Sequence, residues 1–182
     1  QTGSGKTHSM MGSPDDPGVI PRVADAVFDK VDLLEDGRSV RVCASYLQIY
    51  REIVHDLLVD DASGVDLKVR RDPKLGTYVQ GLTEHQIEDA AGLAEIIERG
   101  NKKRAVASTF MNAESSRSHA IVIIRVEQEI EFYAGSSQKK RVFAKMCLVD
   151  LAGSERAKKS GAQDETLQEA IAINQSLSAL GN

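Results

Sequence analysis

The segment QTGSGKTHSMMG at the start of the chain restricts the fold most strongly, because it contains most of a phosphate-binding loop. The full pattern is G-x-x-x-x-G-K-[ST], in which a glycine-rich loop precedes a helix N-terminus. Gly5, Lys6 and Thr7 form the end of this pattern, and its first glycine would precede Gln1. A glycine-rich turn without a ligand is the alternative, but the match over residues 1–7 favours a nucleotide-binding α/β protein.

The residue types in this loop suit a phosphorylated ligand. Glycines let backbone N–H groups close around phosphate oxygens, Lys6 adds a positive charge beside the β- and γ-phosphates, and the Thr7 hydroxyl can bind Mg²⁺. The predicted nucleotide-binding residues are Gln1, Thr2, Gly3, Ser4, Gly5, Lys6, Thr7 and His8.

A second candidate lies at the end of the apolar run 145–149, where Asp150 follows a predicted strand. Many phosphate-loop enzymes place a carboxylate there to hold Mg²⁺ through its waters. Gly153 follows three residues later, where its N–H could contact a γ-phosphate. An aspartate after a strand also commonly caps a helix or forms a turn, so its metal role depends on the phosphate-binding loop.

A third candidate is the polar segment NAESSRSH, residues 112–119. Its hydroxyls, arginine and histidine could order an attacking water and contribute a second Mg²⁺ ligand. It could equally be a serine-rich turn, and its spacing does not decide. His119 is adjacent to no predicted acid or nucleophile, which leaves a Ser/His/Asp hydrolase with little support.

Alternating helices and strands are predicted along the chain from hydrophobic periodicity and turn residues. Gly100 is predicted to end the third helix, and Cys43 and Cys147 lie in apolar runs typical of buried thiols. The predicted helices cover residues 6–11, 21–34, 88–99 and a segment from about 165; the predicted strands cover 40–50, two short stretches within 67–81, 120–130 and 141–149.

Composition and charge exclude some classes of function. The chain has 182 residues, 41% of them hydrophobic, and a formal net charge of -4. This balance argues against a general nucleic-acid binder, and no apolar run is long enough to insert into a membrane. Basic residues cluster at 99–104, 138–141 and 156–159, and each cluster alone is interpreted as a solvated helix end or hairpin tip.

Taken together, three segments resemble the kinesin motor domain: QTGSGKT its P-loop, NAESSRSH its switch I and LVDLAGSER its switch II. PGVIPR, SYLQIYREIVHDLL, GTYVQGLTE, ERGNKKRAVASTFMN and EAIAINQSLSALGN match further kinesin blocks in the same order. The resemblance implies a P-loop NTPase fold with a mixed central β-sheet flanked by helices. Residues 1–182 would form a partial motor domain, truncated at both ends, that extends from the P-loop to the start of the helix after switch II.

The resemblance also assigns roles to the polar residues. Mg²⁺ would be held by Thr7 and Ser116, and by Asp150 through water. Arg117 and Glu155 would form a salt bridge that closes the site, and Glu155 would accept the proton of the attacking water through a second water. The residues with an implied catalytic role are Asn112, Ser115, Ser116, Arg117, Gly153, Glu155 and Asn174.

The implied activity is that of a microtubule-stimulated ATPase that couples switch movements to movement along microtubules in the cytoplasm. Tubulin would face Arg70, Arg71, Lys74, Lys158 and Lys159. The parent protein would dimerise through a coiled coil outside these residues, and residues 1–182 alone would be inactive. The alternatives are a kinesin-like microtubule-binding module without hydrolysis and, with less support, a GTPase-type switch.

Overall fold

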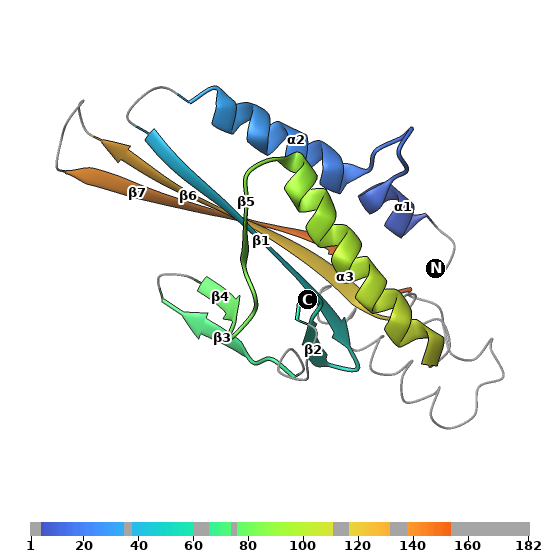
Figure 1. The fold of residues 1–182 in the computed structure, drawn as a ribbon. Coiled ribbons are helices and arrows are strands. Elements are labelled where there is room, and N and C mark those ends of the chain that lie inside the picture. The colour runs from blue at the N-terminus through green and yellow to red at the C-terminus, as the bar shows by residue number, and fades with distance from the viewer. Residues whose placement is uncertain are drawn as a thin grey trace.

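The computed structural model describes residues 5–34, 38–59, 66–73, 76–110, 117–131 and 138–153, with the backbone alone for 106–110. Within these ranges a long twisted sheet carries the helices α2 and α3 on one face, and a small hairpin lies apart from it (Figure 1). The helices are α1 (Lys6–Met11), α2 (Val19–Asp32) and α3 (Ala90–Phe110). The strands are β1 (Arg38–Tyr50), β2 (Ile53–Asp56), β3 (Val69–Asp72), β4 (Gly76–Val79), β5 (His85–Ile87), β6 (His119–Glu131) and β7 (Lys139–Asp150).

The main sheet has the order β2-β1-β6-β7, with β5 paired to β1, and its described pairs are antiparallel. β7 pairs with β6 along its whole length, from Asp150 opposite Ala120 to Lys139 opposite Glu131. This register brings the end of β7 beside the start of β6. The residues just before β6, Arg117 and Ser118, and those just after β7, up to Gly153, therefore lie at the same end of the sheet.

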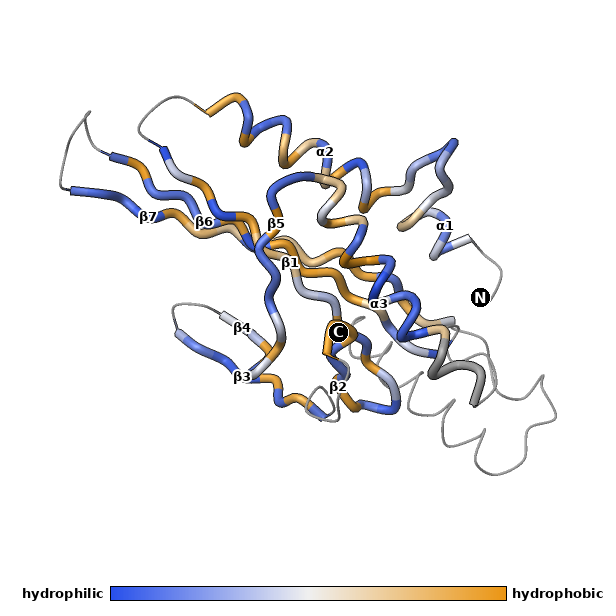
Figure 2. Tube along the Cα trace, in the orientation of Figure 1, coloured by the Kyte–Doolittle hydropathy of each residue, from blue (hydrophilic) through white to orange (hydrophobic). Residues whose placement is uncertain are grey.

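The core lies between the sheet and the helices α2 and α3 (Figure 2). Alternate residues of β6, such as Val122 and Ile124, are buried because successive strand side chains point to opposite faces. The helices contribute residues at helical spacing. The core consists of Ile20, Ala24, Phe28, Val42, Ala44, Tyr46, Leu57, Leu58, Ile87, Leu93, Ile97, Ala120, Val122, Ile124 and Leu148.

The connection between α1 and α2 is the predicted turn, and two glycines, Gly12 and Gly18, allow its backbone segments to approach closely. Gly12 has φ 74°, and its N–H donates to the carbonyl of His8 at 2.7 Å. A Cβ added to Gly12 would lie 2.1 Å from the backbone nitrogen of Gly18. The turn therefore requires glycine at residue 12 for both its backbone conformation and its space.

The prediction that Gly100 ends a helix is wrong. α3 continues to Phe110, and Gly100 is buried in its middle, against the ring of Tyr46 on β1. The phenol of Tyr46 is fully buried and donates to Oδ1 of Asn101 at 2.8 Å. Glycine occurs here because the helix and β1 approach closely, whereas a helix end would have needed a left-handed residue.

The prediction for the cysteines is correct for Cys43, which is buried, and wrong for Cys147, which is exposed. Leu148 and Asp150 of β7 are buried, whereas Cys147 and Val149 point to the opposite face of the strand. Both of these residues are exposed. An apolar run therefore identified the strand but not which of its faces is covered.

The strands β3 and β4 form the predicted short hairpin, which is a separate two-stranded sheet. Arg70 and Arg71 lie on β3 and are exposed. Lys145 of β7 donates to the carbonyl of Thr77 at 2.7 Å and connects the hairpin to the main sheet.

Candidate active site

Thr7 and Asp150 meet at the end of β7. The Thr7 hydroxyl donates to Oδ2 of Asp150 at 2.6 Å, although the two residues are 143 positions apart in the sequence. Thr7 lies in the first turn of α1. The helix begins at Lys6, directly after Gly5, whose φ of 77° is left-handed. The contact between Thr7 and Asp150 holds the first turn of α1 beside the end of β7.

The carboxylate of Asp150 has one buried oxygen that could bind a cation or a water molecule. The residue is only 4% exposed, and its Oδ1 is buried without a hydrogen-bond partner among the described residues. A buried carboxylate oxygen of this kind is costly unless water or a cation satisfies it. Hard oxygen donors are the ligands that Mg²⁺ prefers, so the hydroxyl of Thr7 and the carboxylate of Asp150 fit that ion.

Arg104 of α3 reaches the same site from inside the fold. Its Nη1 lies 3.9 Å from Oδ2 of Asp150, and the two side chains are 8% and 4% exposed. Its Nη2 donates to both the carbonyl and the hydroxyl of Ser118 at 3.2 Å. One buried guanidinium therefore links α3, the residue before β6 and the acid at the end of β7.

Sequence reasoning missed Arg104, because the solvated interpretation of the cluster 99–104 fails at this residue. Lys102 is exposed as expected, but Lys103 donates to the carbonyl of Asp56 at 3.2 Å and Arg99 to that of Leu58 at 2.6 Å. The signal was present in the helical spacing. Arg104 continues the buried face of α3 that comprises Leu93, Ile97 and Gly100.

His119, the first residue of β6, contacts the loop after β7. The Ala152 N–H donates to Nδ1 of His119 at 3.2 Å, and both residues are buried. Burial lowers the pKa of His119, and the positive charge of Arg104 lowers it further. The negative charges of Glu52 and Asp150 raise it, but the net effect is a lowered pKa. The neutral imidazole is therefore favoured, with Nδ1 as the acceptor.

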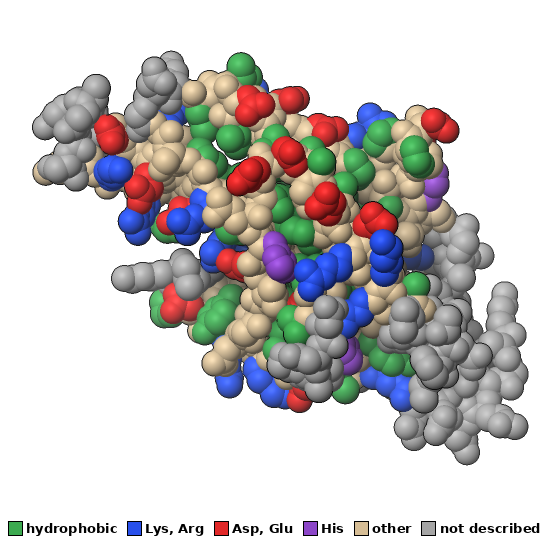
Figure 3. Space-filling model, in the orientation of Figure 1, with side chains coloured by type: hydrophobic (Ala, Val, Ile, Leu, Met, Phe, Trp, Pro, Cys, Tyr) green, Lys and Arg blue, Asp and Glu red, His purple; other side chains and the backbone are tan. Residues whose placement is uncertain are grey.

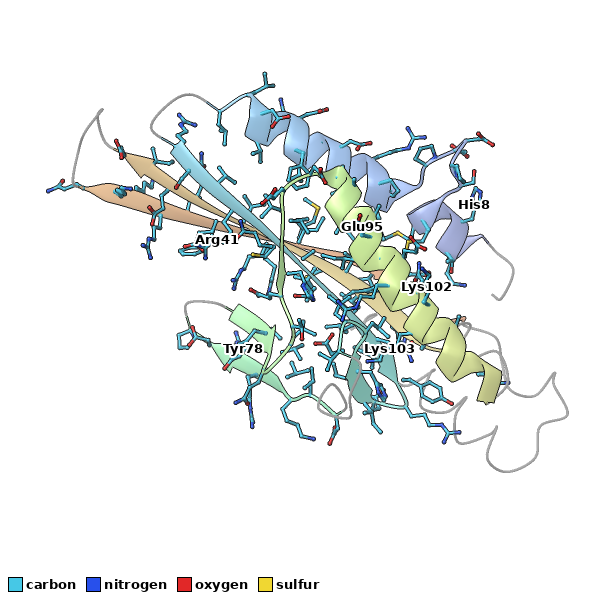
Figure 4. All side chains as sticks on the ribbon, viewed as in Figure 1. His8, Arg41, Tyr78, Glu95, Lys102 and Lys103 are labelled. Atoms are coloured by element: carbon cyan, nitrogen blue, oxygen red, sulfur yellow. The ribbon has the colours of Figure 1, made fainter. Side chains whose placement is uncertain are left out.

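Several predicted site residues are described and lie at or near this edge. Gly153 is buried beside Ala152, and Arg117 is half-buried just before Ser118. His8 lies on the exposed side of α1 (Figure 4). The predicted residues outside the described part are Gln1, Thr2, Gly3, Ser4, Lys74, Asn112, Ser115, Ser116, Glu155, Lys158, Lys159 and Asn174.

The surface over α2 and α3 is rich in acidic side chains (Figure 3). Asp25 and Asp29 of α2 and Glu95 and Glu98 of α3 are all exposed on these helices. An acidic partner would be repelled from this face. Arg70 and Arg71, which were predicted to face tubulin, do not lie on this surface but on the β3–β4 hairpin.

Two further observations limit the classes of site. Among the described residues, no helix is both long and apolar enough to cross a membrane. Within the same part of the chain, no group of three or more His, Cys, Asp or Glu side chains is arranged to hold a metal. The described oxygen donors closest to a cation at Asp150 are its own carboxylate and the Thr7 hydroxyl.

The α/β fold and the pairing of a phosphate-loop threonine with a strand-end aspartate define a P-loop nucleotide-binding protein. The family model for the kinesin motor domain matches residues 1–182. The chain therefore belongs to the kinesin motor domain family, as the three motifs predicted.

Relatives and solved structures agree with this assignment. The chain is 45% identical to kinesin-like protein Klp98A of Drosophila melanogaster over 183 residues, which cover all of this chain and 14% of that protein. It is 44% identical to human kinesin-like protein KIF13B, with 10% of that protein covered. Each of these proteins is thus several times longer than the chain.

The solved structures confirm the predicted fold class. The motor of a fast kinesin matches with a TM-score of 0.85 and 41% identity, over all of this chain and 50% of that one. KIF14 with ADP in complex with a microtubule matches with a TM-score of 0.86, 36% identity and 52% of that chain covered. The chain therefore spans about half the length of these solved chains.

Proposed function

We propose that the protein containing this chain is an ATP-dependent microtubule motor that hydrolyses ATP with Mg²⁺. The observation that carries the proposal is the 2.6 Å contact between Thr7 and Asp150, made within a kinesin motor fold. The contact joins the phosphate-binding loop to the start of the switch II segment, which is the connection that a nucleotide-sensing site needs.

The chain's own residues supply the binding site for the triphosphate. Residues 1–8 would surround the phosphates, with Lys6 placed against the β- and γ-phosphates. Thr7, Ser116 and the buried oxygen of Asp150 would hold Mg²⁺, Asp150 through water. When bound, the ion would neutralise charge that develops on the phosphate oxygens.

Hydrolysis depends mainly on positioning, because phosphoryl transfer needs little covalent participation by the protein. In the proposed site Asn112 and Ser115 order the attacking water, and the Gly153 N–H contacts the γ-phosphate. Arg117 pairs with Glu155 when ATP is bound, and Glu155 accepts the proton of the attacking water through a second water that Asn174 holds.

The proposed partner is the microtubule, which is the partner named in the KIF14 structures. The basic side chains proposed to face tubulin are Arg70, Arg71, Lys74, Lys158 and Lys159. The exposed position of Arg70 and Arg71 on the β3–β4 hairpin supports this. We place the protein on cytoplasmic microtubules, with dimerisation through a coiled coil outside residues 1–182.

The test is phosphate release by a complete motor domain that contains this chain, with and without microtubules. We expect stimulation by microtubules, and Glu155→Ala should suppress it while ATP binding stays largely intact. Glu131→Ala is the control, because Glu131 is the last residue of β6 and pairs with Lys139, at the opposite end of the β6–β7 ladder from Asp150.

Two outcomes would contradict the proposal in different ways. Binding to microtubules without any phosphate release would favour the binding module that does not hydrolyse ATP. Normal turnover by Glu155→Ala would leave the motor assignment standing and remove the role of Glu155.

A further inference from the structure

A side-chain hydrogen bond connects the two polar segments of the site without passing through a nucleotide. His119 ends the segment that begins at Asn112, and Ala152 lies between Asp150 and Gly153. The Ala152 N–H donates to Nδ1 of His119 at 3.2 Å, and the residues are 3% and 7% exposed, respectively. The two switch segments are therefore in direct contact at a buried point.

This hydrogen bond lies just beyond the end of the β6–β7 ladder, where backbone pairing no longer restrains the chain. The β6–β7 ladder ends with Ala120 opposite Asp150, so Ala152 lies beyond the last described backbone pair. The imidazole satisfies the buried Ala152 N–H at a place where the ladder no longer does. A buried N–H left without an acceptor costs about 1–3 kcal/mol, so the bond restrains the backbone there.

His119 itself is held firmly. Its backbone is at the start of β6, opposite Ile49 of β1, and the preceding Ser118 accepts two hydrogen bonds from Arg104. The charged groups that act on the imidazole are Glu52 beyond the end of β1, Arg104 of α3 and Asp150 of β7. The pairing of His119 with β1 and the hydrogen bonds from Arg104 to Ser118 therefore fix the place from which the imidazole accepts the Ala152 N–H.

We propose that His119 is a positioning residue whose Nδ1 fixes the Ala152–Gly153 backbone relative to Ser118 and the start of β6. The inference rests on the proposed function, because it concerns the Gly153 N–H that would contact the γ-phosphate. A shift of the 112–118 segment that moves His119 would release Ala152. The two segments would therefore respond together to the nucleotide, by a route separate from the proposed pair of Arg117 and Glu155.

The geometry of the acceptor gives a sharp test in the complete motor domain. In His119→Asn the amide oxygen can occupy the place of Nδ1, whereas in His119→Gln the polar atoms lie one bond farther out, near the place of Nε2. We expect His119→Asn to keep the microtubule-stimulated kcat within about threefold of wild type, and His119→Gln to lose about tenfold, the equivalent of one hydrogen bond. The KM for ATP should change little in either variant.

A second readout reports on the bond itself. Hydrogen exchange of peptides that cover residues 148–153 should be slow in wild type and His119→Asn, and about tenfold faster in His119→Gln. Thermal unfolding shows whether each variant folds. If His119→Gln does not fold, the proposal is tested by comparing the kcat and the exchange rates of His119→Asn with those of wild type.

The outcomes separate this inference from the proposed function. Equal kcat and equal exchange in the Asn and Gln variants would overturn the role of His119 and leave the ATPase assignment intact. A tenfold loss of kcat in His119→Asn would also overturn it. If wild type released no phosphate, the proposed function would fail and with it the effect of His119 on turnover, while the exchange rates would still decide whether the bond restrains Ala152.

Discussion

The Thr7 hydroxyl and the Asp150 carboxylate share a hydrogen bond of 2.6 Å that joins α1 to the end of β7. The second oxygen of Asp150 is buried and has no hydrogen-bond partner among the described residues. The pair is therefore arranged around a position where a cation with its waters would satisfy the remaining oxygen.

Removal of the Thr7 hydroxyl should uncouple nucleotide binding from Mg²⁺. We expect Thr7→Ala to lose at least about tenfold of the increase in nucleotide affinity that Mg²⁺ brings, whereas Thr7→Ser keeps the hydroxyl and most of the increase. Fluorescence titration of a labelled nucleotide, with Mg²⁺ and with a chelator, measures both. An equal Mg²⁺ effect in the Ala and Ser variants would exclude Thr7 from the metal site.

Arg104 should contribute to stability through burial, and Lys102 of the same helix provides the control. Arg104→Met leaves Asp150 buried without its cation and removes two hydrogen bonds to Ser118, so we expect a loss of about 3 kcal/mol in the free energy of unfolding. Lys102→Met breaks only an exposed pair with Glu98 and should cost far less than Arg104→Met. Urea unfolding of the two variants gives the comparison, and similar losses would contradict the structural role of Arg104.

Two glycines in α3 should respond to alanine in opposite ways. A Cβ at Gly100 would lie 2.2 Å from Cδ1 of Tyr46, whose buried ring has no room to move, so Gly100→Ala should destabilise by about 1–3 kcal/mol or more. At Gly92 the nearest heavy atom would be 3.5 Å away, so Gly92→Ala should stabilise by up to about 1 kcal/mol through helix propensity. Thermal or urea unfolding tests both signs. A neutral Gly100→Ala would show that α3 and β1 can separate at low cost.

The sequence predicted the elements that depend on local pattern. The helix α1, the long strands β1, β6 and β7, and the position of Asp150 at the end of a strand all follow from motif, periodicity and turn residues. A Mg²⁺ site shared by Thr7 and Asp150 was predicted only because the two motifs occur together, and their direct hydrogen bond was not predicted. These features need no knowledge of how the strands are ordered.

The features that were missed depend on contacts between distant elements. Gly100 resembles a helix end in sequence, and only the ring of Tyr46 on β1 explains why glycine continues the helix there. Arg104 lies in a basic cluster whose composition suggests solvent, yet its helical position faces Asp150. His119 finds its partner Ala152 only through the β6–β7 register. None of these partners can be identified from local spacing, because tertiary packing selects them.

Stability should depend on pH through His119, and the sign follows from the buried state of the imidazole. Burial lowers the pKa of His119 in the folded protein, with Arg104 adding to the effect and Glu52 and Asp150 opposing it, while the unfolded chain keeps an ordinary value near 6.5. Below about pH 6.5 the unfolded state therefore binds more protons than the folded state, so the free energy of unfolding falls as the pH falls toward the folded pKa. The contribution is fully present above about pH 7.

His119→Asn keeps an acceptor for Ala152 but does not titrate, so its stability relative to wild type should improve as the pH is lowered from 7.5 to 5.5. Urea unfolding of the two proteins over this range measures the difference, and a difference that stays constant with pH would show that His119 charges as readily in the folded state as in the unfolded one.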